Sequence, residues 1–431
     1  MNRKLVLRLP PKKKILVYAQ IVWVMIMLWL RDVVGLPSWI TYFTDVLLVC
    51  MLVLQLNGIR SGLRRTPVKT QLSITAFIGV GILLGLVLNL VSPLLVVWAA
   101  RNNFRFFAFF FICAGLLQKE DIEKIIGLLL RFFWINVLLC TYQYFVQGRY
   151  GDYLGGLFGV RRGSNTYLNV LLCFVVSHMS GQYFGGKTSI PMFCGYVVAC
   201  VYVAFLAELK VFYLEVFLII SAAMMMKGAS WKTALMLGLC GIGIVILGFL
   251  LSRYDAYTFM LLTDMDAFEF YLSGTGYTQS GDLNRFSAIS QIYELFYQDT
   301  PLKSIFGHGF GSCEYSQFSF LQSAFSQKYE YLNYRWFTHA WVFLEQGAYG
   351  LIMLVAFFAS ILRFCVRIRT TVRNDMLITA FCFALTCIVG LIYNSALQLE
   401  ACYLIAPVCA IPYIQSKKEQ ANTENSKEAS E

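Results

Sequence analysis

The chain has 431 residues, of which 58% are hydrophobic and only 14% are charged, and its formal net charge is +11. Soluble domains carry about 25% charged residues, so this composition excludes an ordinary soluble protein and indicates one embedded in a membrane. Nearly all of the 13 cysteines lie in or beside apolar runs, and none has a CxxC or Cys/His spacing typical of a metal site. We therefore expect no metal and no other cofactor.

Apolar runs recur along the whole chain, and a run of about 18 or more residues can cross a membrane as a helix. The first run ends in Arg31-Asp32 without a small-residue cleavage site, so we expect a retained anchor. The sequence predicts an all-α polytopic membrane protein with roughly twelve transmembrane helices, at 15–34, 37–56, 70–91, 103–117, 121–146, 164–180, 190–206, 210–226, 231–251, 337–362, 375–393 and 396–414. The region 190–226 also fits one broken helix.

We expect residues 1–415 to form a single integral membrane domain, interrupted by one long loop at 252–336. The loop begins with a Gly/Ser/Thr-rich stretch. Apolar residues at helical spacing over 286–296 then predict a short amphipathic helix that lies along the membrane surface and ends before Pro301. The polar residues 416–431 predict a disordered cytoplasmic tail.

Basic residues set the expected orientation, because short segments rich in Lys and Arg stay in the cytoplasm. The N-terminus is strongly basic, and twelve crossings place the basic clusters at 60–69, 363–373 and 417–418 on the same side. We therefore expect both termini in the cytoplasm and the long loop on the outer face. A second set of basic residues then lies outside, at Arg161, Arg162, Lys210, Arg285 and Arg335.

Residues 181–188, GQYFGGKT, match the phosphate-binding P-loop pattern. A working P-loop joins a strand to a helix in an α/β domain, whereas this stretch is a short turn between two predicted membrane helices. The chain has no room there for a nucleotide-binding domain. We therefore do not expect an ATP-driven pump.

Four short stretches resemble the superfamily of O-antigen ligases and polysaccharide polymerases. They are GLFGVRRGSNTYL at 156–168, NRFSAI at 284–289, LFYQDTPLKSIFGHGFGS at 295–312 and THAWVFLEQGAYGL at 338–351. A common pattern in that superfamily has an Asn directly after the histidine that opens the membrane helix, where this chain has Ala340. The resemblance implies many membrane helices, one large external loop and a metal-independent glycosyltransferase.

On this resemblance we expect a polymerase that moves a glycan from undecaprenyl pyrophosphate to a hydroxyl of an acceptor glycan, at the outer face of a bacterial plasma membrane. Expected partners are the lipid-linked glycan, membrane lipids, and a chain-length regulator or other glycan-assembly protein, but no nucleic acid. One alternative is a ligase with a lipid or cell-surface acceptor. Another is a flippase for lipid-linked oligosaccharides, although we see no internal repeat of the kind common in transporters.

The chemistry of this transfer selects the candidate residues for the donor. Cleavage of the sugar–phosphate bond concentrates negative charge on the leaving pyrophosphate, and guanidinium groups bind phosphate through paired hydrogen bonds. We therefore expect Arg285 to act in catalysis, and Arg161, Arg162 and Lys210 to bind the pyrophosphate. The plain alternative for Lys210 is an ion pair with Glu208.

The acceptor hydroxyl requires a base, and a neutral imidazole with an unperturbed pKa of about 6.5 suits that task. His339 is our candidate because it opens a predicted membrane helix at the membrane–water boundary. A capping role is the plain alternative. His308, Glu345 and Arg335 are secondary candidates for the same site.

Overall fold

The computed structural model describes residues 14–228, 281–369 and 375–417, together with single positions between 238 and 276. All regular elements in these residues are helices, which confirms the expected all-α class. The long helices are α1 (Ile15–Asp32), α2 (Phe43–Arg64), α3 (Lys69–Asn89), α4 (Pro93–Leu116), α5 (Lys119–Phe145), α6 (Ser164–Phe184), α7 (Ile190–Leu206), α8 (Lys210–Lys227), α15 (Thr338–Ile368) and α16 (Asp375–Tyr393).

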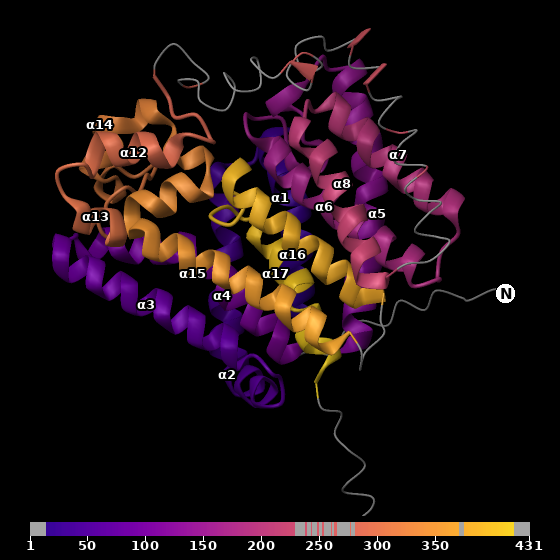
Figure 1. The fold of residues 1–431 in the computed structure, drawn as a ribbon, viewed down its shortest axis with the longest axis horizontal. Coiled ribbons are helices and arrows are strands. Elements are labelled where there is room, and N and C mark those ends of the chain that lie inside the picture. Colours follow the sequence, from indigo (N-terminus) through magenta and orange to yellow (C-terminus); the bar gives the residue numbers. More distant parts are fainter. Residues whose placement is uncertain are drawn as a thin grey trace, which may run out of the picture.

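Shorter helices complete the fold. The segment before α15 contains α12 (Ala288–Phe296), α13 (Pro301–Phe306) and α14 (Ala324–Tyr329), and the chain continues after α16 into α17 (Cys402–Cys409) and α18 (Ile411–Gln415). Single turns of 3-10 helix are η1 (Ser38–Tyr42), η2 (Gly151–Tyr153), η3 (Gly156–Phe158), η4 (Ser319–Leu321), η5 (Glu330–Leu332) and η6 (Tyr334–Trp336). Figure 1 shows α12, α13 and α14 grouped at one corner, next to the end of α3.

Seven helical segments of the described chain are long and apolar enough to cross a membrane. They are Ile15–Asp32, Ser38–Arg64, Lys69–Asn89, Pro93–Leu116, Lys119–Phe145, Thr338–Ile368 and Asp375–Tyr393. This supports a helical membrane protein, but it does not confirm twelve spans. Two further apolar stretches, Ile190–Leu206 and Cys402–Gln415, are shorter. The predicted span 231–251 lies outside the described residues.

Two predicted boundaries differ from the structure for local reasons, and one alternative that the sequence left open is decided. The fourth helix begins at Pro93, where a missing N–H costs nothing in the first turn. The predicted helices 190–206 and 210–226 are confirmed as two separate helices, because the chain turns at Glu208, which has a left-handed φ of 51°. The last predicted helix begins only at Cys402, since the main chain at Gln398 accepts a hydrogen bond from the Arg105 guanidinium.

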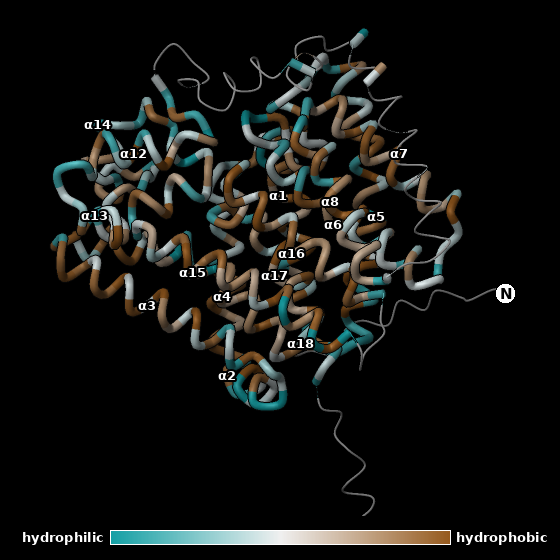
Figure 2. Tube along the Cα trace, viewed as in Figure 1, coloured by the Kyte–Doolittle hydropathy of each residue, from teal (hydrophilic) through white to brown (hydrophobic). Residues whose placement is uncertain are grey.

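The centre of the bundle is α16, which packs against α6, α8, α15 and α17. On the opposite side of α15 lies α3, and hydrophobic residues run along most of its length in Figure 2. Many of these α3 side chains are exposed, as expected for a helix that faces lipid. Hydrophilic residues gather instead around α12 and α14.

Residues 281–337, here called the loop domain, have a hydrophobic core of their own. Ile292, Tyr297, Tyr334 and other buried side chains pack against the first turns of α15. The Tyr297 hydroxyl donates a hydrogen bond of 2.9 Å to the Leu344 carbonyl, which fastens α12 to α15. The predicted helix at 286–296 is confirmed as α12, and its position along the membrane surface stays a prediction. Most of the predicted loop between 252 and 280 lies outside the described residues.

A kink at Gly347 allows the loop domain to approach α15 closely. Gly347 has a φ of 63° within α15, and a Cβ atom there would lie 2.4 Å from the main chain of Ile305 in α13. Gly307, with a φ of 75°, packs equally closely against the main chain of Glu345. Both positions therefore require glycine, because any side chain would separate α13 from α15.

The P-loop-like stretch has the ordinary structure of a helix end. Gly181 lies inside α6, which continues to Phe184. Lys187 places its Nζ 2.5 Å from a carboxylate oxygen of Asp375, so this lysine pairs with the start of α16. The segment is therefore a helix connection.

We predict that Gly347→Ala lowers the thermal stability of the protein in detergent. A left-handed alanine costs about 1–3 kcal/mol even before the clash with α13 is counted. Gly127→Ala is the matched control, because Gly127 lies in α5 with nothing within 4 Å of an added Cβ. Equal melting temperatures for the two variants would contradict this packing of α13 against α15.

Candidate functional site

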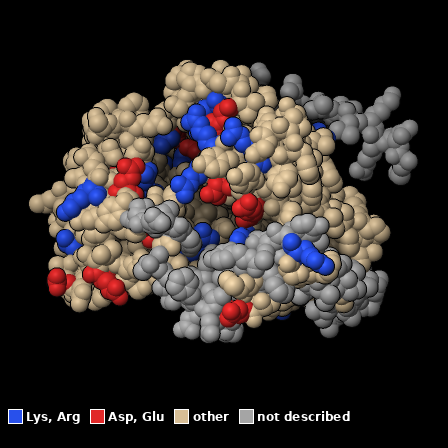
Figure 3. Space-filling view, turned by 90° about the horizontal axis from the view of Figure 1, so that it is seen from above, with Lys and Arg blue, Asp and Glu red and all other residues tan. Residues whose placement is uncertain are grey.

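A cavity of about 680 Å³ opens on the side of the molecule that carries the loop domain. Figure 3 looks into this hollow and shows basic and acidic side chains gathered around it. Its walls come from the end of α1, the segment 152–169, Leu209, the loop domain, the start of α15 and residues 393–400. Parts of the chain that are far apart in sequence therefore meet at one site.

The cavity wall is rich in arginine and in aromatic rings. Five arginines line it, at Arg31, Arg161, Arg162, Arg285 and Arg335, against two acidic residues, Asp152 and Glu400. Five aromatic side chains add flat apolar surface, at Tyr167, Trp336, Phe337, Trp341 and Tyr393. An anionic ligand that also carries apolar or sugar faces suits such a wall.

The structure brings together four of the residues predicted for the site, all of them arginines. Arg161, Arg162, Arg285 and Arg335 line the same cavity. The other four predicted residues, Lys210, His308, His339 and Glu345, do not appear among the cavity-lining residues.

Asp32 fixes the position of Arg161 and of a fifth arginine that sequence reasoning missed. The carboxylate oxygen Oδ1 of Asp32 lies 2.6 Å from the Nε of Arg31 and 2.9 Å from the Nε of Arg161. Asp32 is almost fully buried, whereas the Arg161 side chain is 58% exposed. Gly159 permits this contact, because a Cβ atom there would lie 2.2 Å from Asp32. One carboxylate thus orients two guanidinium groups.

Arg162 and Arg335 lie against aromatic rings of the loop domain. The guanidinium carbon of Arg162 is 4.5 Å from the Trp336 ring centroid, and its Nε is 3.8 Å from Asp152. Arg335 lies 3.9 Å from the Tyr315 ring centroid. Cation–π contacts of this kind hold a guanidinium in place without neutralising its charge.

Arg285 and His339 form one structural unit. The Arg285 guanidinium lies 4.1 Å from the ring centroid of Tyr393 and 5.4 Å from that of Phe337. The Nδ1 of His339 is 3.1 Å from the carbonyl oxygen of Leu391, and the same ring hydrogen-bonds the main chain of Arg285. His339 therefore ties the Arg285 segment to the end of α16.

Glu400 is held as a carboxylate at the cavity wall. It accepts hydrogen bonds of 2.9 Å from Arg105 and 2.6 Å from the Tyr167 hydroxyl. Burial alone would raise the pKa of Glu400, but the Arg105 guanidinium and the Tyr167 hydroxyl outweigh it and hold this pKa at about 2. Glu400 was not among the residues that the sequence predicted for this site.

The remaining predicted residues make internal contacts. His308 lies between the rings of Phe296, Tyr297 and Phe325, and burial, assisted by Lys303, lowers its pKa to about 4. Glu345 is buried and accepts a hydrogen bond of 3.0 Å from the Cys313 amide. Glu345 thereby secures the glycine-rich turn to α15.

Lys210 begins α8 directly beside the cavity. Its neighbour Leu209 lines the cavity. The main-chain amide of Lys210 donates a 3.0 Å hydrogen bond to the carbonyl of Glu208. A contact between the Lys210 side chain and a ligand stays a prediction.

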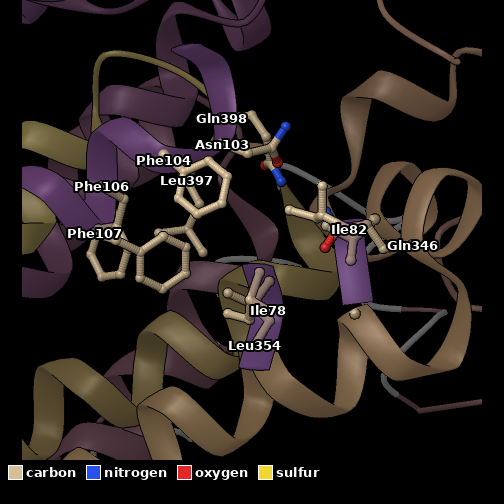
Figure 4. A pocket seen from close by; sticks show the side chains of 12 residues that line it. Ile78, Ile82, Asn103, Phe104, Phe106, Phe107, Gln346, Leu354, Leu397 and Gln398 are labelled. Carbon is tan, nitrogen blue, oxygen red and sulfur yellow. The ribbon is translucent and has the colours of Figure 1, made fainter. Parts of the chain in front are cut away.

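A second cavity, shown in Figure 4, is far too small for a glycan. Its volume is about 30 Å³, and it lies between α3, α4 and α15. Phenylalanines and aliphatic side chains surround the amides of Asn103, Gln346 and Gln398 there. A space of this size holds about one water molecule.

No protein-family model matches the chain, and a search of curated proteins finds no significant match. Within the described parts of the chain, no group of three or more His, Cys, Asp or Glu side chains is arranged to hold a metal ion.

Glu400→Gln is expected to destabilise the protein by about 3–5 kcal/mol, because it leaves the buried Arg105 without its counter-charge. The Arg105 side chain is only 2% exposed. Glu330→Gln removes an exposed partner of Arg335 and should cost no more than about 1 kcal/mol. Thermal unfolding of both variants tests this difference, and similar losses would contradict it.

We also predict that His308 makes the loop domain sensitive to acid. A histidine with a lowered pKa in the folded state takes up a proton more readily when unfolded, so stability falls as pH drops from about 6.5 to 4. His308→Phe should show a smaller loss of melting temperature between pH 7.5 and pH 5 than the wild type. An unchanged pH dependence would contradict the assigned burial.

Proposed function

We propose that this protein is a membrane glycosyltransferase, and specifically a polysaccharide polymerase. It transfers a glycan from undecaprenyl pyrophosphate to a hydroxyl of an acceptor glycan, at the outer face of a bacterial plasma membrane. The observation that carries this proposal is the meeting of five arginines in one aromatic-walled cavity at the ends of apolar helices.

The charge of the cavity suits a pyrophosphate leaving group. Five arginines face two carboxylates, and both carboxylates are already engaged by arginine side chains. Arg31 and Arg161 share Asp32, so their guanidinium groups are positioned before any ligand arrives. Cations held in place near developing negative charge stabilise a transition state, and losing one such group typically lowers kcat by about 100- to 1000-fold.

The size and position of the cavity suit a lipid-linked glycan. Its volume of about 680 Å³ lies within the common range of ligand sites. Trp336 and Tyr393, the rings that hold Arg162 and Arg285, add apolar surface beside these guanidinium groups, while Asn165 and Asn333 offer amide groups to sugar hydroxyls. The ends of α1, α15 and α16 form part of its wall. A carrier lipid that lies beside these helices would therefore present its pyrophosphate at the level of the cavity.

The contacts of His339 favour a positioning role. Its ring is engaged by the carbonyl of Leu391 and by the main chain of Arg285, and it does not line the cavity. We therefore assign His339 to holding Arg285 in place.

A ligase is the second candidate because it would use the same donor site with a different acceptor. A flippase for lipid-linked oligosaccharides is the third. Transporters usually bind substrate near the membrane midplane, whereas these arginines gather where the apolar helices end, which favours an enzyme.

The test is a gel of lipid-linked and surface glycans from a deletion strain complemented at matched expression. We predict that Arg285→Ala and Arg161→Ala collapse the polymer ladder to single repeat units. Arg149→Ala is the control, because Arg149 is exposed and lies outside the cavity. Its ladder should match the wild type.

Other outcomes of this gel distinguish the alternatives. Long lipid-linked chains that are not transferred would indicate a ligase. Repeat units trapped on the cytoplasmic side of the deletion strain would indicate a flippase. Normal ladders in both cavity variants would overturn the proposed site.

A further inference from the structure

The proposed transfer needs a group that takes the proton from the acceptor hydroxyl. Both carboxylates that line the cavity already have partners. Glu400 is bound by Arg105 and the Tyr167 hydroxyl, and Asp152 accepts a 2.8 Å hydrogen bond from Asn165 and lies 3.8 Å from Arg162. The Arg105 guanidinium favours the charged form of Glu400 and makes this carboxylate a weak base.

A third carboxylate, Glu215 of α8, lies buried beneath the cavity. Its side chain is 1% exposed. The amide of Asn169 donates to one of its oxygens at 3.3 Å, and the thiol of Cys173 donates to the other at 3.1 Å. Beside it lies a small cavity of about 30 Å³, which is large enough for one water molecule.

This small cavity adjoins the large one. Asn169 and Asn394 line both of them. Thr338 lines the small cavity and donates its main-chain amide to the Asn394 carbonyl at 2.9 Å. A water molecule in the small cavity would therefore lie beside the Glu215 carboxylate and next to Asn169 and Asn394, which also line the large cavity.

The groups around Glu215 are neutral. They are Asn169 and Cys173 on α6, Thr338 on α15, and Thr386 and Cys387 on α16, with Cys200 of α7 close to Cys173. Within the described residues, Glu215 forms no ion pair. A buried carboxyl group without a cation is costly, and inside a membrane protein such a group usually binds or relays protons.

We propose that Glu215 and its small cavity form a proton-accepting site that serves the large cavity. This role rests on the proposed glycan transfer. The acceptor oxygen bonds to C1 of the donor sugar while the bond from C1 to the pyrophosphate breaks, and that electron pair leaves with the pyrophosphate. The hydroxyl proton passes through water to Glu215, which becomes a carboxylic acid and later releases the proton to the cavity.

The proton site is tested without glycan by infrared difference spectra of the full-length protein in lipid vesicles, taken between low and high pH. We expect the wild type to show the carbonyl band of a buried carboxylic acid that disappears as pH rises. This band should be missing in Glu215→Gln and unchanged in Asp152→Asn. Cys173→Ala keeps the carboxyl group and should shift the band, because one hydrogen bond is lost. A band that persists in Glu215→Gln would overturn the assignment.

Transfer is then measured against pH with a purified lipid-linked donor. Glu215→Gln should lower turnover by about 100-fold or more, as expected for loss of a general base. It should also lose the fall in rate at acidic pH while binding the donor normally. Asp152→Asn should keep the wild-type pH profile. The proposed role would be overturned if the transfer rate of Glu215→Gln depended on pH as in the wild type. It would also be overturned if Asp152→Asn lost the fall in rate at acidic pH.

The two proposals fail in different ways. If the wild type forms no polymer from a bound donor, the proposed function fails and the role of Glu215 in transfer fails with it. The infrared titration still decides whether Glu215 binds a proton from the cavity. If polymer forms normally in Glu215→Gln, only the proton-accepting role is overturned.

Discussion

The shape of the cavity depends on an ion pair that is buried away from water. Arg105 has a side chain that is only 2% exposed, and its partner Glu400 also accepts the Tyr167 hydroxyl. This pair connects α4, α6 and the segment before α17. An isolated charge at that depth would be very costly, so each group requires the other. The non-helical course of residues 394–401 follows from these contacts, and that course forms one wall of the cavity.

Asp32 has a similar role at the end of α1. One buried carboxylate orients Arg31 and Arg161, and it also accepts a 3.3 Å hydrogen bond from the Val160 amide. Arg161 nevertheless stays largely exposed. The buried acid therefore fixes the arginines without covering them, and positive charge remains available to a ligand. Preorganisation of this kind is what a leaving pyrophosphate requires.

Much of the fold was predictable from the sequence, because long apolar runs and an amphipathic pattern report helices directly. The gathering of Arg161, Arg162, Arg285 and Arg335 was predicted only as a set of residues on one face. Their contacts were not, since the rings that hold them are distant in sequence. Arg31 was missed because an arginine at the end of an apolar run is normally interpreted as a residue that only anchors the end of a membrane helix.

The roles of the histidines were the part of the site that the sequence predicted least well. The sequence places His339 at the mouth of a membrane helix, but it does not show that main-chain groups occupy its ring. His308 sits in a glycine turn that resembles a functional loop, yet aromatic rings surround it. Glu215 was overlooked as one polar residue in an apolar run. Its importance depends on a small cavity that only the packed helices create.

The most direct test of the account is equilibrium binding of undecaprenyl pyrophosphate to the purified protein. Arg161→Ala removes one charge-assisted contact, worth about 1.5–3 kcal/mol, and should weaken binding by about tenfold or more. Arg149→Ala, outside the cavity, should bind like the wild type. Equal affinity of the wild type and Arg161→Ala would contradict the central claim that this cavity holds the pyrophosphate.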